Sequence, residues 1–258
     1  MNMGYFKTEL KRAIYSKNTL ISAALIYICI FIGTIEYLFQ FTTMTNATYL
    51  FLMGHSTGTI SIISLLFPIL VSIPFASSYV SDVQSGFIQY IQTRLEKWKY
   101  ITVRLLINGL VSGGIISTCL LVSFFFFMLI RGFDVSPSPY INVSSKNELY
   151  DLYHNWTTGY ILLYILQSFI SGVVFSTLGL GLSTFIKNKY FAVLSPFLFY
   201  IVSGTLLIQI NKFFHSAIIF NLGTYGDLKY SYVVLYTIIL LGVGVTLFTV
   251  GVLKNDEV

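Results

Sequence analysis

Charged residues are scarce in this chain. Asp, Glu, Lys and Arg make up 10% of its 258 residues, whereas 55% are hydrophobic. A soluble domain of this length carries about 25% charged residues, because polar side chains must cover its core. The composition leaves too little polar surface to face water, so we predict that lipid surrounds most of the protein.

Residues that carry catalytic or metal chemistry are also few. The two cysteines, Cys29 and Cys119, lie inside apolar runs and predict neither a disulfide nor a metal framework. The histidines, His55, His154 and His215, fall in predicted outer loops without the close spacing of metal ligands, so we expect ordinary surface residues. Because the sequence has no nucleophile–base pattern and no paired carboxylates, it predicts no catalytic residue and no metal site.

Long apolar runs dominate instead. A membrane core of about 30 Å requires roughly 20 mostly apolar residues in a helix. Such runs lie at residues 19–39, 60–80, 101–130, 158–186, 190–210 and 231–253. They are too long and too continuously apolar for strands of a membrane barrel. The sequence therefore predicts an all-α polytopic membrane protein with six transmembrane helices in a single domain, residues 1–258.

The distribution of Lys and Arg predicts the orientation. If the N-terminus lies inside, eleven of the fifteen basic residues are cytoplasmic: Lys7, Lys11, Arg12, Lys17, Arg94, Lys97, Lys99, Arg104, Lys187, Lys189 and Lys254. The remaining four, Arg131, Lys146, Lys212 and Lys229, are then in outer loops. This asymmetry favours an N-in, C-in topology, and it explains the positive charge without a nucleic-acid partner.

The segment before the first run, residues 1–18, predicts a basic amphipathic helix. Phe6, Leu10, Ala13 and Ile14 follow helical spacing, and Lys and Arg fill the rest of the helical wheel. Such a helix would lie in the cytoplasmic interface with its apolar face in the acyl boundary. The alternative is a simple determinant of topology with no further role.

The break between the second and third runs is the most informative stretch. Asp82 ends the second run, and a short helix follows with Val83, Phe87 and Tyr90 or Ile91 on one face. This helix is too short to span the membrane and too apolar for a free loop. We expect it to lie across the cytoplasmic surface and to present that face to a partner, or else to be an interfacial turn without a partner.

These residues resemble a known family. Asp82, Ser85, Gly86, Phe87, Thr93, Arg94, Tyr100 and Arg104, with the opening Phe6-Lys-Thr-Glu-Leu-Lys-Arg12, are similar to the permease subunits of type-2 ATP-binding cassette transporters, the ABCG-like exporter fold. The resemblance covers the whole chain in plan, but only residues 5–17 and 82–104 in motif. The loop after the second run has fewer acidic residues than the family often shows.

The resemblance implies a coupling role for this loop. In the family, a short helix there seats in a cleft of a separate nucleotide-binding subunit, and two permeases work with two such subunits. The implied coupling residues are Asp82, Val83, Ser85, Gly86, Phe87, Tyr90, Ile91 and Arg94. The chain has no G-x-x-x-x-G-K-[ST] loop, so ATP and Mg would be bound by the partner ATPase subunit. The second permease is either identical or a sister chain.

The resemblance also implies a translocation pathway along spans two and five. Pro68, Pro74 and Pro196 lie in these spans, where each removes a backbone hydrogen bond and favours a kink. The aromatic residues Phe67, Phe75, Phe197, Phe199 and Tyr200 accompany them and would suit an apolar or amphipathic cargo. The alternative is that these side chains face lipid or the core.

Small and polar residues predict helix contacts. Ser168, Gly172, Ser176, Gly179 and Ser183 form one stripe on the fourth span, which favours close packing within the chain over packing between subunits. Asn108 and Gln167 predict hydrogen bonds between helices. Glu36, near the outer end of the first span, is either an intramembrane site or a headgroup contact.

Together these features predict the permease subunit of an ABC exporter in a bacterial cytoplasmic membrane. It would move a peptide or bacteriocin, an antibiotic or a lipid-like substrate outward and would have no enzymatic site of its own. The alternatives are a membrane scaffold or signalling subunit and, third, a secondary transporter, which the scarcity of intramembrane acids disfavours.

Overall fold

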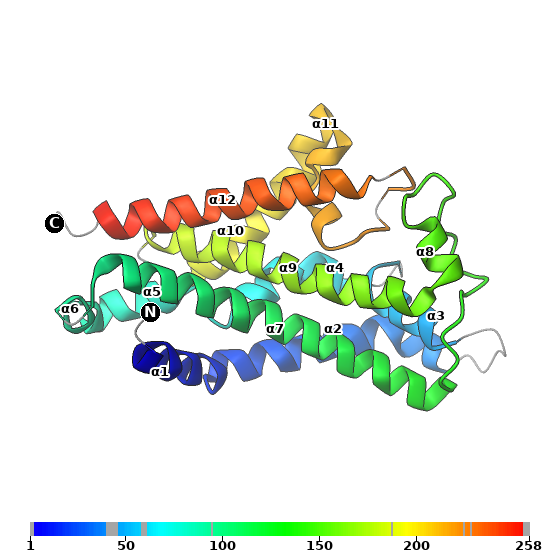
Figure 1. Ribbon diagram of the computed structural model, residues 1–258, viewed down its shortest axis with the longest axis horizontal. Coiled ribbons are helices and arrows are strands. Elements are labelled where there is room, and N and C mark those ends of the chain that lie inside the picture. Colours follow the sequence, from blue (N-terminus) through cyan, green and yellow to red (C-terminus); the bar gives the residue numbers. More distant parts are fainter. Residues whose placement is uncertain are drawn as a thin grey trace.

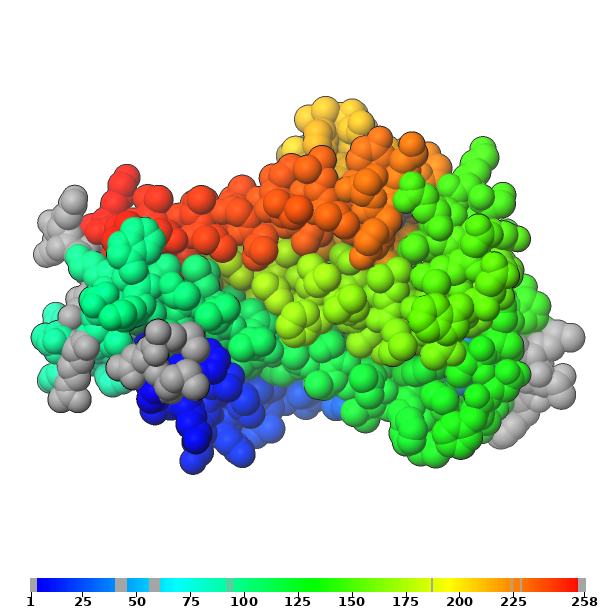
Figure 2. Space-filling model, viewed as in Figure 1, coloured from blue at the N-terminus to red at the C-terminus, as the bar shows by residue number. Residues whose placement is uncertain are grey.

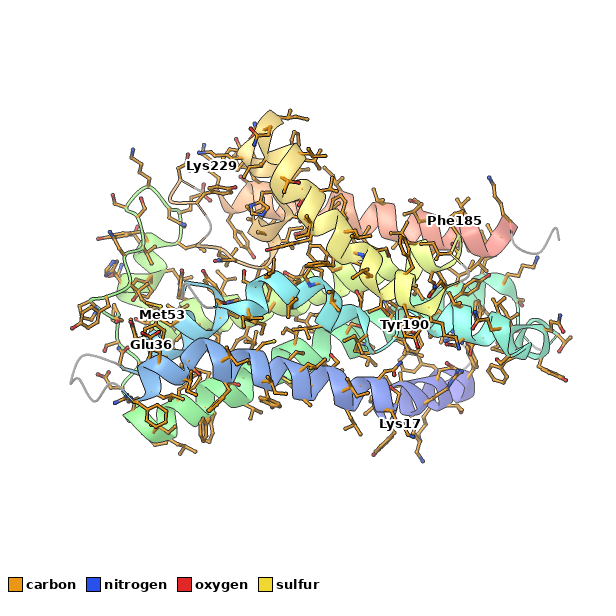
Figure 3. The ribbon with its side chains drawn as sticks, turned by 180° about the vertical axis from the view of Figure 1, so that it is seen from behind. Lys17, Glu36, Met53, Phe185, Tyr190 and Lys229 are labelled. Carbon is orange, nitrogen blue, oxygen red and sulfur yellow. The ribbon has the colours of Figure 1, made fainter. Side chains whose placement is uncertain are left out.

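The computed structural model describes residues 3–39, 46–57, 61–93, 95–186, 188–223, 225–227 and 229–254. Among these residues there are helices and turns but no strand. Five helical segments are long and apolar enough to cross a membrane: α2 (Lys17–Leu38), α7 (Lys97–Arg131), α9 (Thr157–Ser183), Lys189–Ile210, and α12 (Tyr230–Lys254). Helices α2, α7, α9 and α12 run roughly along the long axis of the molecule, and Lys189–Ile210 crosses them obliquely (Figure 1, Figure 3). The prediction of an all-α, multi-pass membrane protein is confirmed at this level.

The second predicted span is not one continuous helix. Residues 60–80 were expected to form it, but the structure has α4 (Ile62–Ser72), a turn, and α5 (Ser78–Gln84). Eleven residues of α4 rise only about 16 Å, too little to cross the membrane core. Pro74 lies in the turn and cannot donate to the Leu70 carbonyl four residues back. The Ser22 hydroxyl of α2 donates to that carbonyl instead, at 2.7 Å.

Pro68, inside α4, frees a second carbonyl in the same way. Because proline has no N–H, the Ser64 carbonyl receives no bond from its own helix at this position. The Tyr200 hydroxyl donates to the Ser64 oxygen at 2.9 Å. Tyr200 belongs to α10 (Lys189–Val202), which is followed by a π-helical turn, Ser203–Leu207, and the short α11 (Ile208–Ile210). A neighbouring helix thus satisfies the backbone group that the proline leaves without a partner.

Tyr200→Phe is expected to destabilise the protein by about 1 kcal/mol, because the Ser64 carbonyl then has no donor in an apolar environment. In a Pro68→Ala background the alanine supplies a backbone N–H that can donate to that carbonyl, so the same substitution should cost close to nothing. Unfolding of all four proteins in mixed micelles measures this cycle. Equal costs of Tyr200→Phe in both backgrounds would show that the hydroxyl does not serve this carbonyl.

The segment predicted as the first outer loop, 40–58, is largely helical. Residues 40–45 and 58 lie outside the described residues, but Ala47–Leu52 forms α3 and Met53–Thr57 a π-helical turn. Every residue of α3 is buried. Asn46 caps α3 by accepting from the Tyr49 N–H at 2.9 Å, and its amide donates to the Ser136 carbonyl at 2.8 Å. The loop prediction was wrong because the apolar residues in 47–53 form too short a run to identify as a buried helix.

The segment after α11 packs into the bundle. Short 3₁₀ turns cover Lys212–Phe214 and Ser216–Ile219, and α8 (Tyr150–Asn155) lies at the same end of the molecule. Ile218, Ile219 and Phe220 are fully buried. The Phe220 ring stacks on Phe67 with centroids 4.0 Å apart. This segment therefore closes one end of the core.

Helix α9 lies at the centre and contacts α4, α7, α10 and α12. Its stripe of small residues packs within the chain. A Cβ on Gly172 would lie 2.9 Å from Gly113 Cα of α7, so the two backbones touch. Asn108 of α7 donates to Ser176 at 3.1 Å, and Gly179 faces Pro196 and Ala192 of α10. The Gln167 amide donates to the Ile219 carbonyl at 2.8 Å, so it links α9 to the 3₁₀ turn Ser216–Ile219.

The two ends of the bundle differ. Helices α1 (Met3–Ile14) and α6 (Phe87–Gln92) and the last turn of α12 lie at one end, called the α6 end here, and α3 and α8 lie at the other, the α8 end (Figure 1). Figure 3 shows Lys17 and Tyr190 toward the α6 end, with Glu36 and Met53 toward the α8 end. Glu36 is exposed.

Candidate functional site

Helix α1 packs against the first turns of α7. Three of the four residues predicted on its apolar face, Phe6, Leu10 and Ala13, join a cluster with Val103 and Ile107 of α7. The fourth, Ile14, is 47% exposed. The expected helix is present, but its apolar face meets protein rather than the acyl boundary. The reason is that α7 extends as a helix from Lys97 and supplies an apolar surface at this end.

Glu9 shares this inward face and completes a ring of four charges. Arg12 donates to Asp82 Oδ1 at 2.7 Å and to Glu9 Oε1 at 3.3 Å. Arg104 pairs with the other oxygen of each carboxylate, Asp82 Oδ2 and Glu9 Oε2, the latter at 3.5 Å. Each guanidinium therefore bridges both carboxylates. This charge ring, Glu9–Arg12–Asp82–Arg104, joins α1, α5 and α7.

Three of the four side chains in the charge ring are buried. Arg104 is 0% exposed, Asp82 1% and Glu9 3%, whereas the Arg12 side chain is 46% exposed. Removing a charge from water costs several kcal/mol per ion, and only close opposite charges offset that cost. Two positive and two negative groups make the ring neutral, so its burial is tolerated only while its positive and negative charges balance.

Aromatic rings surround the Arg104 guanidinium. It lies 5.2 Å from the Phe75 ring centroid and 5.3 Å from that of Tyr100, within cation–π range. Burial raises the pKa of Tyr5 on α1, and the neighbouring Arg104 charge lowers it in part. Phe75, predicted from the sequence as a pathway residue, therefore forms a wall of the charge ring.

The chain turns at a glycine shortly after Asp82. Gly86 has φ 71°, in the left-handed region that favours glycine, and separates α5 from α6. Ile91 anchors α6 in a cluster with Tyr100 of α7 and Phe248 of α12. The Arg12 guanidinium lies 5.4 Å from the Phe87 ring centroid, which ties α6 to α1.

This geometry corrects the predicted face. Val83, Phe87 and Tyr90 are exposed by 46%, 41% and 72%, but Ile91 is buried at 6%. The turn at Gly86 separates Val83 from the residues of α6, and Ile91 is buried because it packs against Tyr100 of α7 and Phe248 of α12. Ser85 is exposed, and Arg94, like Lys187, lies outside the described residues.

The exposed face of α6 lies beside α1, because the Phe87 ring contacts the Arg12 guanidinium. Figure 2 shows α1 and the segment around α6 next to each other at the α6 end. Phe87 and Arg12 connect α6 to α1, and Asp82 and Arg104 connect α5 to α7.

The predicted pathway residues lie mostly inside the chain. Phe67, Pro68, Pro74, Phe75, Pro196 and Tyr200 are buried, whereas Phe197 and Phe199 are half-buried. Phe67 packs edge-on against Phe175 with centroids 5.5 Å apart. In this structure these side chains shape the packing of α4 and α10, and Tyr200 also satisfies a backbone carbonyl.

His55 is not a surface residue, which corrects the sequence prediction. It is 1% exposed, its Nε2 lies 3.0 Å from the Ser168 hydroxyl, and its ring stacks on Phe220 at 4.4 Å. His154 is exposed, and His215 Nδ1 lies 3.2 Å from the Tyr225 hydroxyl. Within the described residues, no group of three His, Cys, Asp or Glu side chains is placed to hold a metal.

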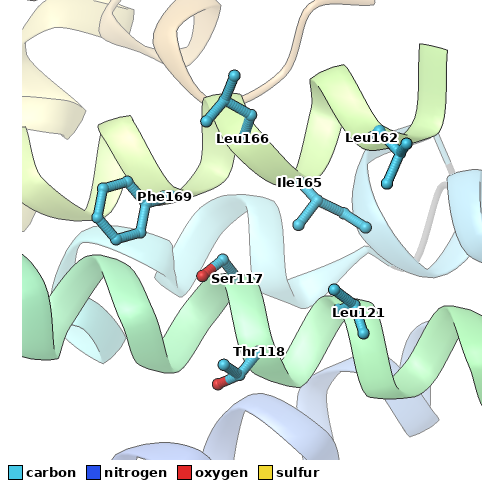
Figure 4. A pocket seen from close by; sticks show the side chains of 7 residues that line it. All are labelled: Ser117, Thr118, Leu121, Leu162, Ile165, Leu166 and Phe169. Atoms are coloured by element: carbon cyan, nitrogen blue, oxygen red, sulfur yellow. The ribbon is translucent and has the colours of Figure 1, made fainter. Parts of the chain in front are cut away.

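An apolar pocket of about 390 Å³ lies between α7 and α9 (Figure 4). It is lined by Ser117, Thr118, Leu121, Leu162, Ile165, Leu166 and Phe169. Both hydroxyls donate to the Gly114 carbonyl of their own helix. The pocket therefore offers apolar surface and no converging polar groups.

No protein-family model, curated protein or solved structure matches this chain. The ring includes a residue that the sequence argument did not single out, Glu9. Its signal was present: Glu9 lies four residues from both Tyr5 and Ala13, so it is an acid on the apolar face of a basic helix. Asp82 and Arg104 were noted for their resemblance to a motif, but not as a pair.

Proposed function

We propose that this chain is the membrane-spanning permease subunit of an ATP-driven exporter, and that α6 receives the force from a separate ATPase subunit. One observation carries this proposal. A short helix exposes Phe87 and Tyr90 at the end of the bundle, while the residues at its base are tied through the charge ring to α1 and α7. An exposed apolar surface of this kind suits a protein partner.

The remaining features of the proposal follow the same plan. The broken α4–α5 segment would be the second of six membrane crossings, in addition to the five long helical segments. The α6 end is cytoplasmic, with both termini inside, and the membrane is that of a bacterial cell. ATP and Mg are bound by the ATPase subunit, because the chain lacks a phosphate-binding loop. A second permease, identical or sister, completes the complex.

The cargo would be an amphipathic peptide such as a bacteriocin, an antibiotic or a lipid-like molecule. If it passes between two permeases along α4 and α10, it meets the side chains that these helices expose. Leu65 of α4 and Leu194 and Leu198 of α10 are exposed by 49%, 38% and 41%. These residues, more than the buried Phe67 and Tyr200, would determine cargo preference.

The test uses an ATPase subunit of the ATP-binding cassette class, sought among the genes adjacent to the one that encodes this chain. Phe87→Ser with Tyr90→Ser should abolish co-purification of the ATPase and the stimulation of its hydrolysis, because the docking surface loses its apolar contacts. Trp156→Ser removes a side chain that is also exposed, 62%, at the α8 end and should change neither.

Stability must be measured in parallel. Tyr90 is exposed, whereas Phe87 also packs against the Arg12 guanidinium, so we expect the free energy of unfolding to fall by about 1 kcal/mol in the double variant. The proposal fails if no such ATPase associates with the unaltered chain, or if the double variant still stimulates hydrolysis normally.

A further inference from the structure

Helix α1 presents a basic face outward. Its apolar face and Glu9 are turned toward α7, which leaves Lys7, Thr8 and Lys11 exposed. Lys7 and Lys11 are one helical turn apart, so their side chains leave the helix on the same side. Lys17, also exposed, follows where α1 ends and α2 begins.

The charges of this face are not neutralised by the protein. Arg12 forms ion pairs with Asp82 and Glu9, and the exposed Lys99 forms an ion pair with Glu96 at 2.8 Å. In the described part of the chain, Lys7, Lys11 and Lys17 form no ion pair. Two unneutralised like charges therefore lie on one side of α1, and Lys17 adds a third at the start of α2.

The position of this surface indicates what covers it. Beyond Lys17, α2 exposes Leu20 by 67% and Ile21 by 52%, as a helix in contact with acyl chains does. Tyr15, 76% exposed, lies between Lys11 and Lys17, and tyrosine prefers the headgroup level of a membrane. The basic surface thus lies where the apolar face of α2 begins.

We propose that Lys7, Lys11 and Lys17 form a binding surface for the phosphate-bearing headgroups of anionic phospholipids. Charge complementarity supports this occupant, since lysines near a membrane attract anionic lipids individually and add their effects. Helix α1 contacts the membrane through its charged face, and its apolar face holds the bundle.

The experiment places a fluorescent reporter on this surface. In a W98F/W156F background, Y15W gives a single indole between Lys11 and Lys17. The full chain is reconstituted in vesicles of phosphatidylcholine with a minority of phosphatidylglycerol, with one lipid or the other brominated near the headgroup. We expect brominated phosphatidylglycerol to quench this indole about three-fold more, at equal mole fraction, than brominated phosphatidylcholine.

Matched variants separate this surface from general membrane contact. The quenching ratio is the quenching by brominated phosphatidylglycerol divided by that by brominated phosphatidylcholine. K7Q/K11Q/K17Q should bring this ratio to about one, whereas K7R/K11R/K17R and K99Q should preserve the preference for phosphatidylglycerol. Trp156, kept as the only indole in a W98F chain, should show no preference at the α8 end. High salt should abolish the preference of the unaltered surface, which tests the proposal even if the glutamine variant does not insert.

A ratio near one for the Y15W reporter at low salt would overturn the proposal. So would a preference that survives K7Q/K11Q/K17Q or high salt, or one that Trp156 shares. In those cases the basic face would serve topology or an acidic protein partner instead.

Discussion

Arg104→Met is expected to destabilise the protein by about 3–5 kcal/mol, because it leaves two buried carboxylates with a single, half-exposed partner. Asp82 and Glu9 are 1% and 3% exposed, so water cannot replace the lost guanidinium. Unfolding in mixed micelles, followed by circular dichroism, measures the loss. Lys99→Gln breaks the exposed pair with Glu96 and should cost less than about 1 kcal/mol.

A second variant distinguishes lost charge balance from lost packing. In Arg104→Met with Glu9→Gln, one charge of each sign is gone, and the 2.7 Å pair between Arg12 and Asp82 remains. We expect at least half of the lost stability to return, because no uncompensated carboxylate is left buried. If Arg104→Met costs no more than Lys99→Gln, the charge ring does not hold α1 and α5 to α7.

Gly181→Val is expected to cost about 3 kcal/mol by forcing α9 and α12 apart. A Cβ on Gly181 would lie 2.6 Å from the Gly244 carbonyl oxygen and 3.0 Å from Leu247 Cβ. The first contact is with backbone, so it cannot be relieved by rotation of a side chain, and overpacking of this kind costs about 1–3 kcal/mol or more. The same unfolding measurement detects it.

Gly114→Val is the matched control. Gly114 lies within α7, and a Cβ there would meet no atom within 4 Å. Both substitutions place valine in a helix, so the effect of its propensity cancels, and Gly114→Val should change stability by about 0.5 kcal/mol or less. Similar losses in the two variants would show that the α9–α12 contact tolerates a larger side chain.

Some features of the site could be predicted from neighbouring residues. The spacing of Phe6, Leu10 and Ala13 predicts α1, and the stripe on the fourth span predicts the surface that packs within the bundle. The amide of Asn108 signals a contact between helices. Each of these inferences uses residues within a few turns of one helix, where the backbone geometry is known in advance.

Other features depend on residues far apart in the chain. Arg12 and Asp82 are separated by 70 positions, and Asp82 and Arg104 by 22. No periodicity links such residues, so the sequence indicated the acid and the bases without showing that they form one ring. The burial of Ile91 likewise depended on its contacts with α7 and α12.

The sequence by itself determined the solvent of this protein and its all-helical, multi-pass character, because hydrophobic length and scarce charge are local properties of the chain. Only the tertiary structure decided which apolar residues face lipid and which face protein. Lipid is as apolar as a helix interface, so hydropathy assigned α3 to a loop and joined α4 to α5 in one span. The break at Pro74 and the burial of α3 follow from contacts with neighbouring helices, as do the closing of the charge ring and the outward turn of the lysines of α1.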